Sequence, residues 1–160
     1  MTGTALTNAG SPLGRLIGAW EFEASSGGRF LGRGVATFEW AENGAFVIER
    51  AVDKADLATS EDWATHSPMP VTALLGWDDA TGELTQLYSD ARGVFRVYRM
   101  TLTDEAWTVW RDAPGFFQRF VGRFGDGGAT IGGRWESSPD GNDWEPDFDL
   151  LYRRRTATDR

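Results

Sequence analysis

Arginine and tyrosine side chains at alternating positions are the strongest chemical signal in this sequence. Between residues 93 and 125 apolar and polar residues alternate, as in half-buried strands whose successive side chains point to opposite faces. This spacing places Arg96 and Tyr98 on one face with the apolar Val94 and Met100. A guanidinium group is costly to bury without a partner, so an inward-facing Arg96 would need an anionic or carbonyl-bearing ligand. The pattern predicts a pocket for such a molecule.

Arg50 is the second arginine that could bind a ligand inside the fold. Whether it points inward depends on the register of a hairpin whose turn contains the Asn-Gly pair at positions 43–44. A two-residue loop would place Phe38 opposite Glu49, whereas a three-residue loop would place Phe38 opposite Ile48. The three-residue loop is preferred because it buries four large side chains together, and it turns Arg50 inward. The four large side chains are Phe38, Trp40, Phe46 and Ile48.

The faces expected to point inward combine aromatic walls with a few polar side chains. Because no carboxylate is among them, Arg50 and Arg96 would need water or a ligand to satisfy their hydrogen bonds. The alternative is that both arginines lie near strand ends and reach solvent along their alkyl stems, or that a one-residue slip replaces Arg96 with Arg99. Asp147 and Asp149 share a face that the alternation places outside. The predicted ligand-binding residues are Phe38, Trp40, Phe46, Arg50, Arg96, Tyr98, Met100, Gln118, Phe120, Trp135 and Tyr152.

The single histidine, His66, lies in a long segment that has no strand pattern. Residues 53–70 are too many for a plain connection in a compact domain, which indicates a lid or rim segment with a turn of helix near residues 60–64. His66 is expected at the rim, either as a ligand contact or as a surface residue without a role. A Ser-His-Asp triad would have to draw its serine and aspartate from this same segment, and the Gly-x-Ser-x-Gly elbow of many hydrolases is absent from the sequence.

Metal and cofactor chemistry are not expected from this set of residues. Zinc and non-heme iron sites usually need two or more nitrogen or sulfur ligands, but the chain has one histidine and no cysteine. The nitrobindins, heme-binding barrels of related shape, take their iron ligand from a histidine late in the chain, and none follows His66 here. The acidic string at 140–147 lacks EF-hand spacing and predicts a hairpin turn.

The composition describes an acidic protein of one domain. The chain has 160 residues, a formal net charge of -8 and a pI near 4.6. Nucleic acid is therefore an improbable partner, because its binding rests on neutralising phosphates. No stretch approaches the roughly eighteen apolar residues of a membrane span, and the start of the chain does not look like a signal peptide. We expect a cytoplasmic protein that does not bind membranes, and the absence of cysteine agrees with this.

The order of the predicted elements favours an all-β fold. About ten strands follow one another, nearly all joined by short turns, and no helical repeat separates them. This favours an up-and-down antiparallel β-barrel, since closure removes exposed sheet edges, and a two-sheet sandwich is the runner-up. A short N-terminal helix, capped by Ser11 and Pro12 and ending near Ile17, would cover one barrel end. We expect a flexible arm at 1–10, one barrel domain at 11–155 and a tail at 156–160.

Several strings in the chain resemble a known family. Gly18-Ala19-Trp20, with Arg153 or Arg154 at the end of the last strand, looks like the lipocalin and calycin closure, in which a tryptophan packs against an arginine. The strings SDARGVFRVYRM, VWRDAPGFFQRFVGRF and IGGRWESSPDGNDWEPDFDLLYRR resemble a bacterial family of small lipocalin-like barrels whose function is not established. The resemblance covers roughly residues 15–154 and implies a fold rather than a reaction.

Three functions remain open at this point. The favoured hypothesis is that the barrel binds a small, largely hydrophobic ligand with a polar or anionic end. The alternative is a cofactor-independent cavity enzyme of the cyclase or isomerase type, in which Tyr98, Tyr152 or a desolvated acid acts on a hydrophobic carbonyl-bearing intermediate and arginine stabilises an enolate. The third is a filled barrel that works through its outer surface. The sequence leaves the oligomeric state open.

Overall fold

The computed structural model describes residues 11–41 and 43–156. The predicted arm at 1–10 and residues 157–160 of the predicted tail lie outside this part of the chain. A 3-10 turn η1 (Pro12–Arg15), a helix α1 (Glu61–His66) and a second 3-10 turn η2 (Asp126–Gly128) accompany ten strands. The strands are β1 (Gly18–Ser26), β2 (Arg29–Trp40), β3 (Phe46–Lys54), β4 (Val71–Trp77), β5 (Leu84–Asp90), β6 (Phe95–Leu102), β7 (Ala106–Arg111), β8 (Phe117–Gly125), β9 (Thr130–Ser138) and β10 (Glu145–Arg154).

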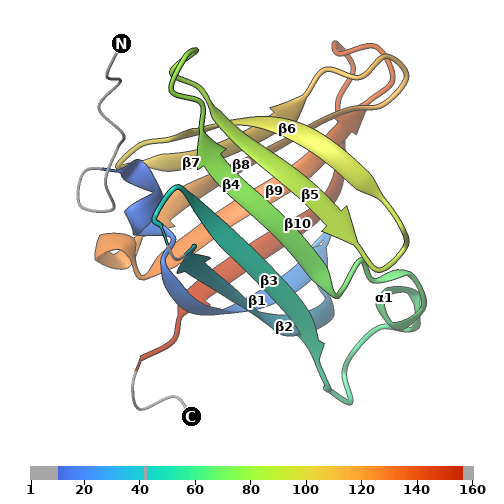
Figure 1. Cartoon of the computed structure of the whole chain (residues 1–160). Coiled ribbons are helices and arrows are strands. Elements are labelled where there is room, and N and C mark those ends of the chain that lie inside the picture. The colour runs from blue at the N-terminus through green and yellow to red at the C-terminus, as the bar shows by residue number, and fades with distance from the viewer. Residues whose placement is uncertain (1–10, 42, 157–160) are drawn as a thin grey trace.

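The ten strands form one closed antiparallel barrel. Each strand pairs with its neighbours in the chain, and β1 pairs with β10 to complete the circle. Figure 1 shows η1 at one end of the barrel and α1 at the other. The predicted up-and-down barrel is confirmed, and the sandwich alternative is wrong because closure leaves no break between two sheets. No helix in the described part of the chain is long and apolar enough to cross a membrane.

The N-terminal segment covers one end of the barrel, as predicted, but it is a single 3-10 turn rather than a longer helix. The hydroxyl of Ser11 accepts a hydrogen bond from the backbone N–H of Leu13, and Pro12 occupies the first turn, where its missing N–H costs nothing. Leu13 and Leu16 are buried in the core. We call this end of the barrel, covered by η1, the closed end.

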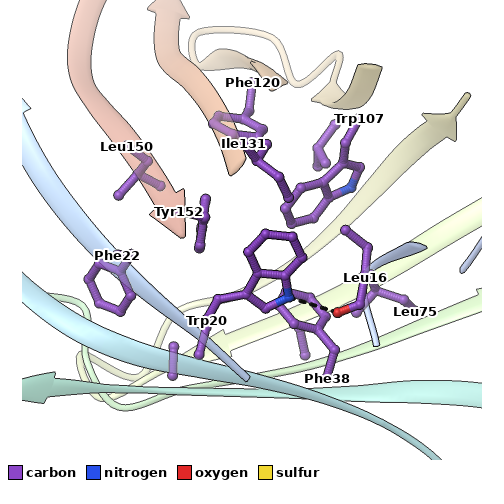
Figure 2. Packing of buried hydrophobic residues seen from close by; sticks show 14 of the residues in the cluster. Leu16, Trp20, Phe22, Phe38, Leu75, Trp107, Phe120, Ile131, Leu150 and Tyr152 are labelled. Carbon is purple, nitrogen blue, oxygen red and sulfur yellow. Dashed lines mark hydrogen bonds between the residues drawn. The ribbon is translucent and has the colours of Figure 1, made fainter. Parts of the chain in front are cut away.

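Trp20 and Arg154 join the first and last strands at the closed end. The two residues lie opposite each other in the β1–β10 register, and the guanidinium carbon lies 4.1 Å from the centre of the indole ring. The indole N–H donates to the carbonyl oxygen of Leu16 at 2.9 Å (Figure 2). Arg154 in turn donates to the carbonyl oxygen of Ile17. The predicted tryptophan–arginine closure is confirmed, with Arg154 rather than Arg153 over the ring.

The predicted register of the β2–β3 hairpin is wrong by one residue. The structure pairs Phe38 with Glu49, so the side chains of Phe46, Ile48 and Arg50 point outward. The cause is the conformation of the turn. Ala41 donates its N–H to the carbonyl oxygen of Phe46 at 2.8 Å, which pairs these two residues, whereas the three-residue loop would have paired Ala41 one residue earlier. Gly44 has φ +69°, a left-handed conformation that glycine adopts without strain. Val47, Glu49 and Ala51 therefore face the interior.

Candidate ligand-binding cavity

The barrel interior contains a cavity of about 400 Å³ that extends from the core to the segment around α1. Its size lies within the roughly 300–1,000 Å³ typical of small-molecule sites. We call the end at α1 the mouth. Aromatic and aliphatic side chains make most of its walls: Phe22, Leu31, Trp63, Val71, Trp107, Val109, Phe120, Trp135, Phe148 and Leu150. The polar side chains in the barrel are Glu49, Gln86, Tyr88, Tyr98, Gln118 and Tyr152.

The structure brings part of the predicted ligand-binding set together around this cavity. The predicted residues that line it are Arg96, Tyr98, Gln118, Phe120, Trp135 and Tyr152, with His66 from the rim. The predicted residues that do not line it are Phe38, Trp40, Phe46, Arg50 and Met100. Phe38 and Met100 are buried in the core nearer the closed end, while Phe46 and Arg50 are on the outer face because of the register shift. Binding of a ligand by the lining residues stays a prediction.

Glu49, on β3, is an acid that the sequence reasoning did not place in the interior. Its side chain lines the cavity and is only 6% exposed. Within the described part of the chain, its carboxyl group makes no ion pair and no hydrogen bond. Loss of hydration on burial raises its pKa from 4.5 to about 7, since the charged form is disfavoured in an apolar environment. The two-residue Asn-Gly alternative, which pairs Phe38 with Glu49, was the signal that could have found it.

Tyr152 is another polar residue that lines the cavity. Its ring packs edge-on against Trp20 and is tilted against Phe22 and Trp107. Its hydroxyl has no hydrogen-bond partner among the residues that the structure describes. Burial raises the pKa of this phenol, and the negative charge of Glu49 raises the pKa further. We call Glu49 and Tyr152 the inner polar pair.

Tyr98, by contrast, already has its hydrogen-bond partner. Its hydroxyl donates to the side-chain oxygen of Gln118 at 2.9 Å across the barrel wall, from β6 to β8. Its ring packs edge-on against Tyr88 and Trp135, with centroids 6.0 and 5.6 Å apart. Burial raises the pKa of Tyr98, while the nearby Arg96 opposes that shift. This phenol is therefore held in one orientation as part of the wall.

The segment between β3 and β4 forms the rim of the mouth, as predicted. Ser60 caps α1 by accepting a hydrogen bond from the backbone N–H of Trp63 at 3.1 Å. Trp63 points into the barrel, packs edge-on against Phe148 and donates its indole N–H to Asp53 at 2.9 Å. His66 is exposed at the end of this helix, where its ring lies 3.2 Å from the carboxylate of Asp62. Ser67 also donates its hydroxyl to Asp53 at 2.7 Å. Ser60 donates its backbone N–H to the carbonyl oxygen of Leu31 at 2.7 Å, so both ends of α1 are attached to the barrel.

Charged side chains of both signs surround the mouth. Arg96 lies over the ring of Phe116 at 5.2 Å, and Arg92 forms an ion pair with Asp90 at 2.7 Å. Asp147 also lines the cavity, although the sequence alternation placed it outside. A β-bulge after Pro146 interrupts the alternation on β10 and changes the direction of Asp147. Asp149 does face outward, as predicted, and pairs with Arg134 on β9.

Comparison with known protein families finds no match, and no curated protein matches this chain. Among solved structures, the barrel is similar to the crystal structure of Rv2717c from M. tuberculosis, with a TM-score of 0.59 and 13% sequence identity. The match covers 96% of this chain and 98% of that chain. At such low identity the likeness shows a shared fold alone. The barrel is consistent with a calycin-like protein, while the resemblance to the lipocalin-like family stays a prediction.

The described residues contain no group of three or more histidine, cysteine, aspartate or glutamate side chains that could hold a metal ion. What the site offers chemically is an apolar chamber with arginines at its mouth. Inside it, the unpaired polar groups among the described residues are the carboxyl group of Glu49, the phenol of Tyr152, the side-chain oxygen of Gln86 and the indole N–H of Trp107. Such a chamber can enclose a small molecule and orient it by its polar groups.

The two buried tyrosines give a direct test of these hydrogen-bond assignments. Tyr98→Phe is expected to lower the free energy of unfolding by about 1–3 kcal/mol, because it leaves the buried oxygen of Gln118 without a donor. Tyr152→Phe is the matched control, and we expect a change of less than about 0.5 kcal/mol because its hydroxyl has no partner to lose. Urea denaturation of both variants measures the difference. Equal destabilisation by the two substitutions would contradict the assignment.

Proposed function

We propose that the cavity binds a small, largely hydrophobic molecule that has a polar end. The observation that carries the proposal is the cavity of about 400 Å³ inside a closed barrel, with walls that are mostly aromatic and aliphatic. Removal of apolar ligand surface from water would drive binding, at roughly 25 cal/mol per Å² of buried area. The few polar groups would then fix the orientation of the ligand rather than supply most of the affinity.

Arg96 could pair with an anionic group of the ligand at the mouth. It is near the start of β6, lines the cavity and is partly exposed, so a carboxylate beside it would remain in contact with water. Arg50, the other arginine expected to bind an anion, is exposed on the outer face and takes no part. The apolar body of the ligand would lie against Trp107, Phe120 and Trp135.

Filling the cavity tests this proposal. Ala51 lines the cavity, whereas its neighbour Val52 is half exposed on the outer face of the same strand, β3. We expect Ala51→Trp to weaken binding of the fluorescent probe 8-anilinonaphthalene-1-sulfonate by at least about tenfold, which corresponds to 1.4 kcal/mol. Val52→Trp should leave the affinity unchanged. The readout is probe emission during titration of the folded protein.

Circular dichroism of each variant shows that the barrel is intact, and Val109→Trp, from β7, provides a second way to fill the same space. Equal probe affinity of the wild-type protein, both filled variants and Val52→Trp would contradict binding inside the barrel. It would favour an outer surface as the functional site.

A further inference from the structure

Among the residues that the structure describes, the one charged residue that is buried as a whole is an acid, Glu49, not an arginine. The one-residue shift of the β2–β3 register removes Arg50 from the interior and places Glu49 there. In the middle of β3, Glu49 is nine-tenths or more buried and has no ion pair or hydrogen bond within residues 11–41 and 43–156. It faces a cavity large enough for a ligand. Glu49 therefore attracts positive charge and hydrogen-bond donors, whereas an inward Arg50 would attract negative charge. The neutral indole N–H of Trp107, which lines the same cavity, is an unpaired donor among the described residues.

We propose that the ligand is a hydrophobic amine whose ammonium group enters first and pairs with Glu49 beside the hydroxyl of Tyr152. This inference rests on the proposed function and names the chemical class of the molecule. The ammonium group supplies three N–H donors, and the inner polar pair supplies acceptors that have no partner in the described structure.

An ammonium group suits this position better than the other polar groups a small molecule could carry. A carboxylate would meet the like charge of Glu49 in an apolar interior, where repulsion is strong. A buried ion pair is often no better than an apolar contact, because two charges must leave water. Here folding has already removed the carboxyl group of Glu49 from water, so the desolvation cost of binding comes from the ligand alone. The aromatic rings of Tyr152 and Trp107 can also attract a cation.

The other charged groups around the cavity are of both signs and lie at its mouth, and the phenols inside it are neutral. The phenols inside the barrel are Tyr88, Tyr98 and Tyr152, which stay neutral at physiological pH because burial raises the pKa of each. The groups at the mouth are Arg29, Arg92, Arg96, Asp62, Asp147 and His66. Asp90 pairs with Arg92, and the guanidinium of Arg111 lies 5.9 Å from the ring centre of Tyr98. These groups together count four arginines and three aspartates. A cation must therefore pass a mouth of mixed charge before it reaches Glu49. The whole chain has a net charge of -8, which attracts cations from solution.

Three molecules with one skeleton test the inference: 4-phenylbutylamine, 4-phenylbutan-1-ol and 4-phenylbutanoate, titrated calorimetrically into the whole protein. At pH 8 we expect the amine to bind at least about tenfold more tightly than the alcohol, and the carboxylate to bind most weakly. Burial places the pKa of Glu49 at about 7, so the preference for the amine should fall as the pH is lowered through 7. Glu49→Gln should lower the ratio of amine affinity to alcohol affinity to about one. Glu39→Gln, which removes an exposed acid on β2, should change neither.

The outcomes separate this inference from the proposed function. Binding of the alcohol with no preference for the amine, or a preference that survives in Glu49→Gln, would overturn the inference and leave the binding cavity in place. Tighter binding of the carboxylate than of the amine would also overturn it. If none of the three molecules binds, both the amine inference and the proposed function fail. If Glu49→Gln binds no alcohol, circular dichroism identifies a folding defect and Glu49→Leu replaces it as the variant without an acid.

Discussion

Glu49→Gln is expected to remove much of the pH dependence of folding stability between about pH 4.5 and 7. The pKa of this carboxyl group is 4.5 when exposed and about 7 in the folded barrel, because burial disfavours the charged form. Between these values the folded protein keeps a proton that the unfolded chain releases. The free energy of unfolding therefore falls as the pH rises, by about 3 kcal/mol in total. The stabilising contribution is fully present below pH 4.5 and is lost above pH 7.

Urea denaturation of the wild-type protein and of Glu49→Gln at several pH values measures this effect. The other titratable groups act on both proteins, so the difference between the two free energies of unfolding isolates Glu49. Relative to the wild-type protein, we expect the free energy of unfolding of Glu49→Gln to rise by about 3 kcal/mol between pH 4.5 and 8. Glu39→Gln, an exposed acid on β2, should follow the wild-type curve. If the free energies of unfolding of wild type and Glu49→Gln change in parallel with pH, the carboxyl group of Glu49 has the same pKa in the folded protein as in water, and the expectation is wrong.

Trp20→Ala is expected to cost about 3–5 kcal/mol of folding stability, the range for large buried aromatic side chains. The Trp20 side chain is 0% exposed, and its removal leaves a large void at the closed end. The substitution also leaves the Leu16 carbonyl without its indole donor and removes the ring beneath Arg154. Thermal and urea unfolding measure the loss.

Trp77→Ala serves as the control, because Trp77 is 39% exposed at the end of β4 and should cost less than about 1 kcal/mol. If Trp20→Ala does not fold, Trp20→Phe keeps part of the ring and loses only the indole donor and some volume, and we expect a loss of about 2 kcal/mol. If Trp20→Ala, or Trp20→Phe in its place, is as stable as Trp77→Ala, Trp20 does not stabilise the closed end of the barrel.

Most of the fold could be predicted from the sequence because alternation and turn residues are local signals. The alternation on β6 placed Tyr98 and Met100 inside, and both are buried. The Trp20–Arg154 pairing was predicted from the ends of the chain and is confirmed. Alternation can be recognised in the sequence because each strand of a barrel has one solvent-exposed face and one buried face.

The interior charge could not be predicted, because it depends on single-residue details of the backbone. One residue in the turn between β2 and β3 decides whether Arg50 or Glu49 faces the cavity, and hydrophobic burial alone favoured the wrong choice. One residue in the bulge of β10 likewise brings Asp147 into the mouth. Alternation has period two, so each such detail exchanges the two faces of a strand.

The junction of β1 with β10 also determines when the barrel can be completed during synthesis. Arg154 donates to the carbonyl oxygen of Ile17 across 137 positions of sequence, so the first strand has no second neighbour until the last one leaves the ribosome. Contacts this distant in sequence slow folding, and an incomplete sheet presents unpaired backbone groups to other chains. A nascent chain that stops before β10 therefore has two open edges. We expect such truncated products to aggregate more than a chain that includes β10.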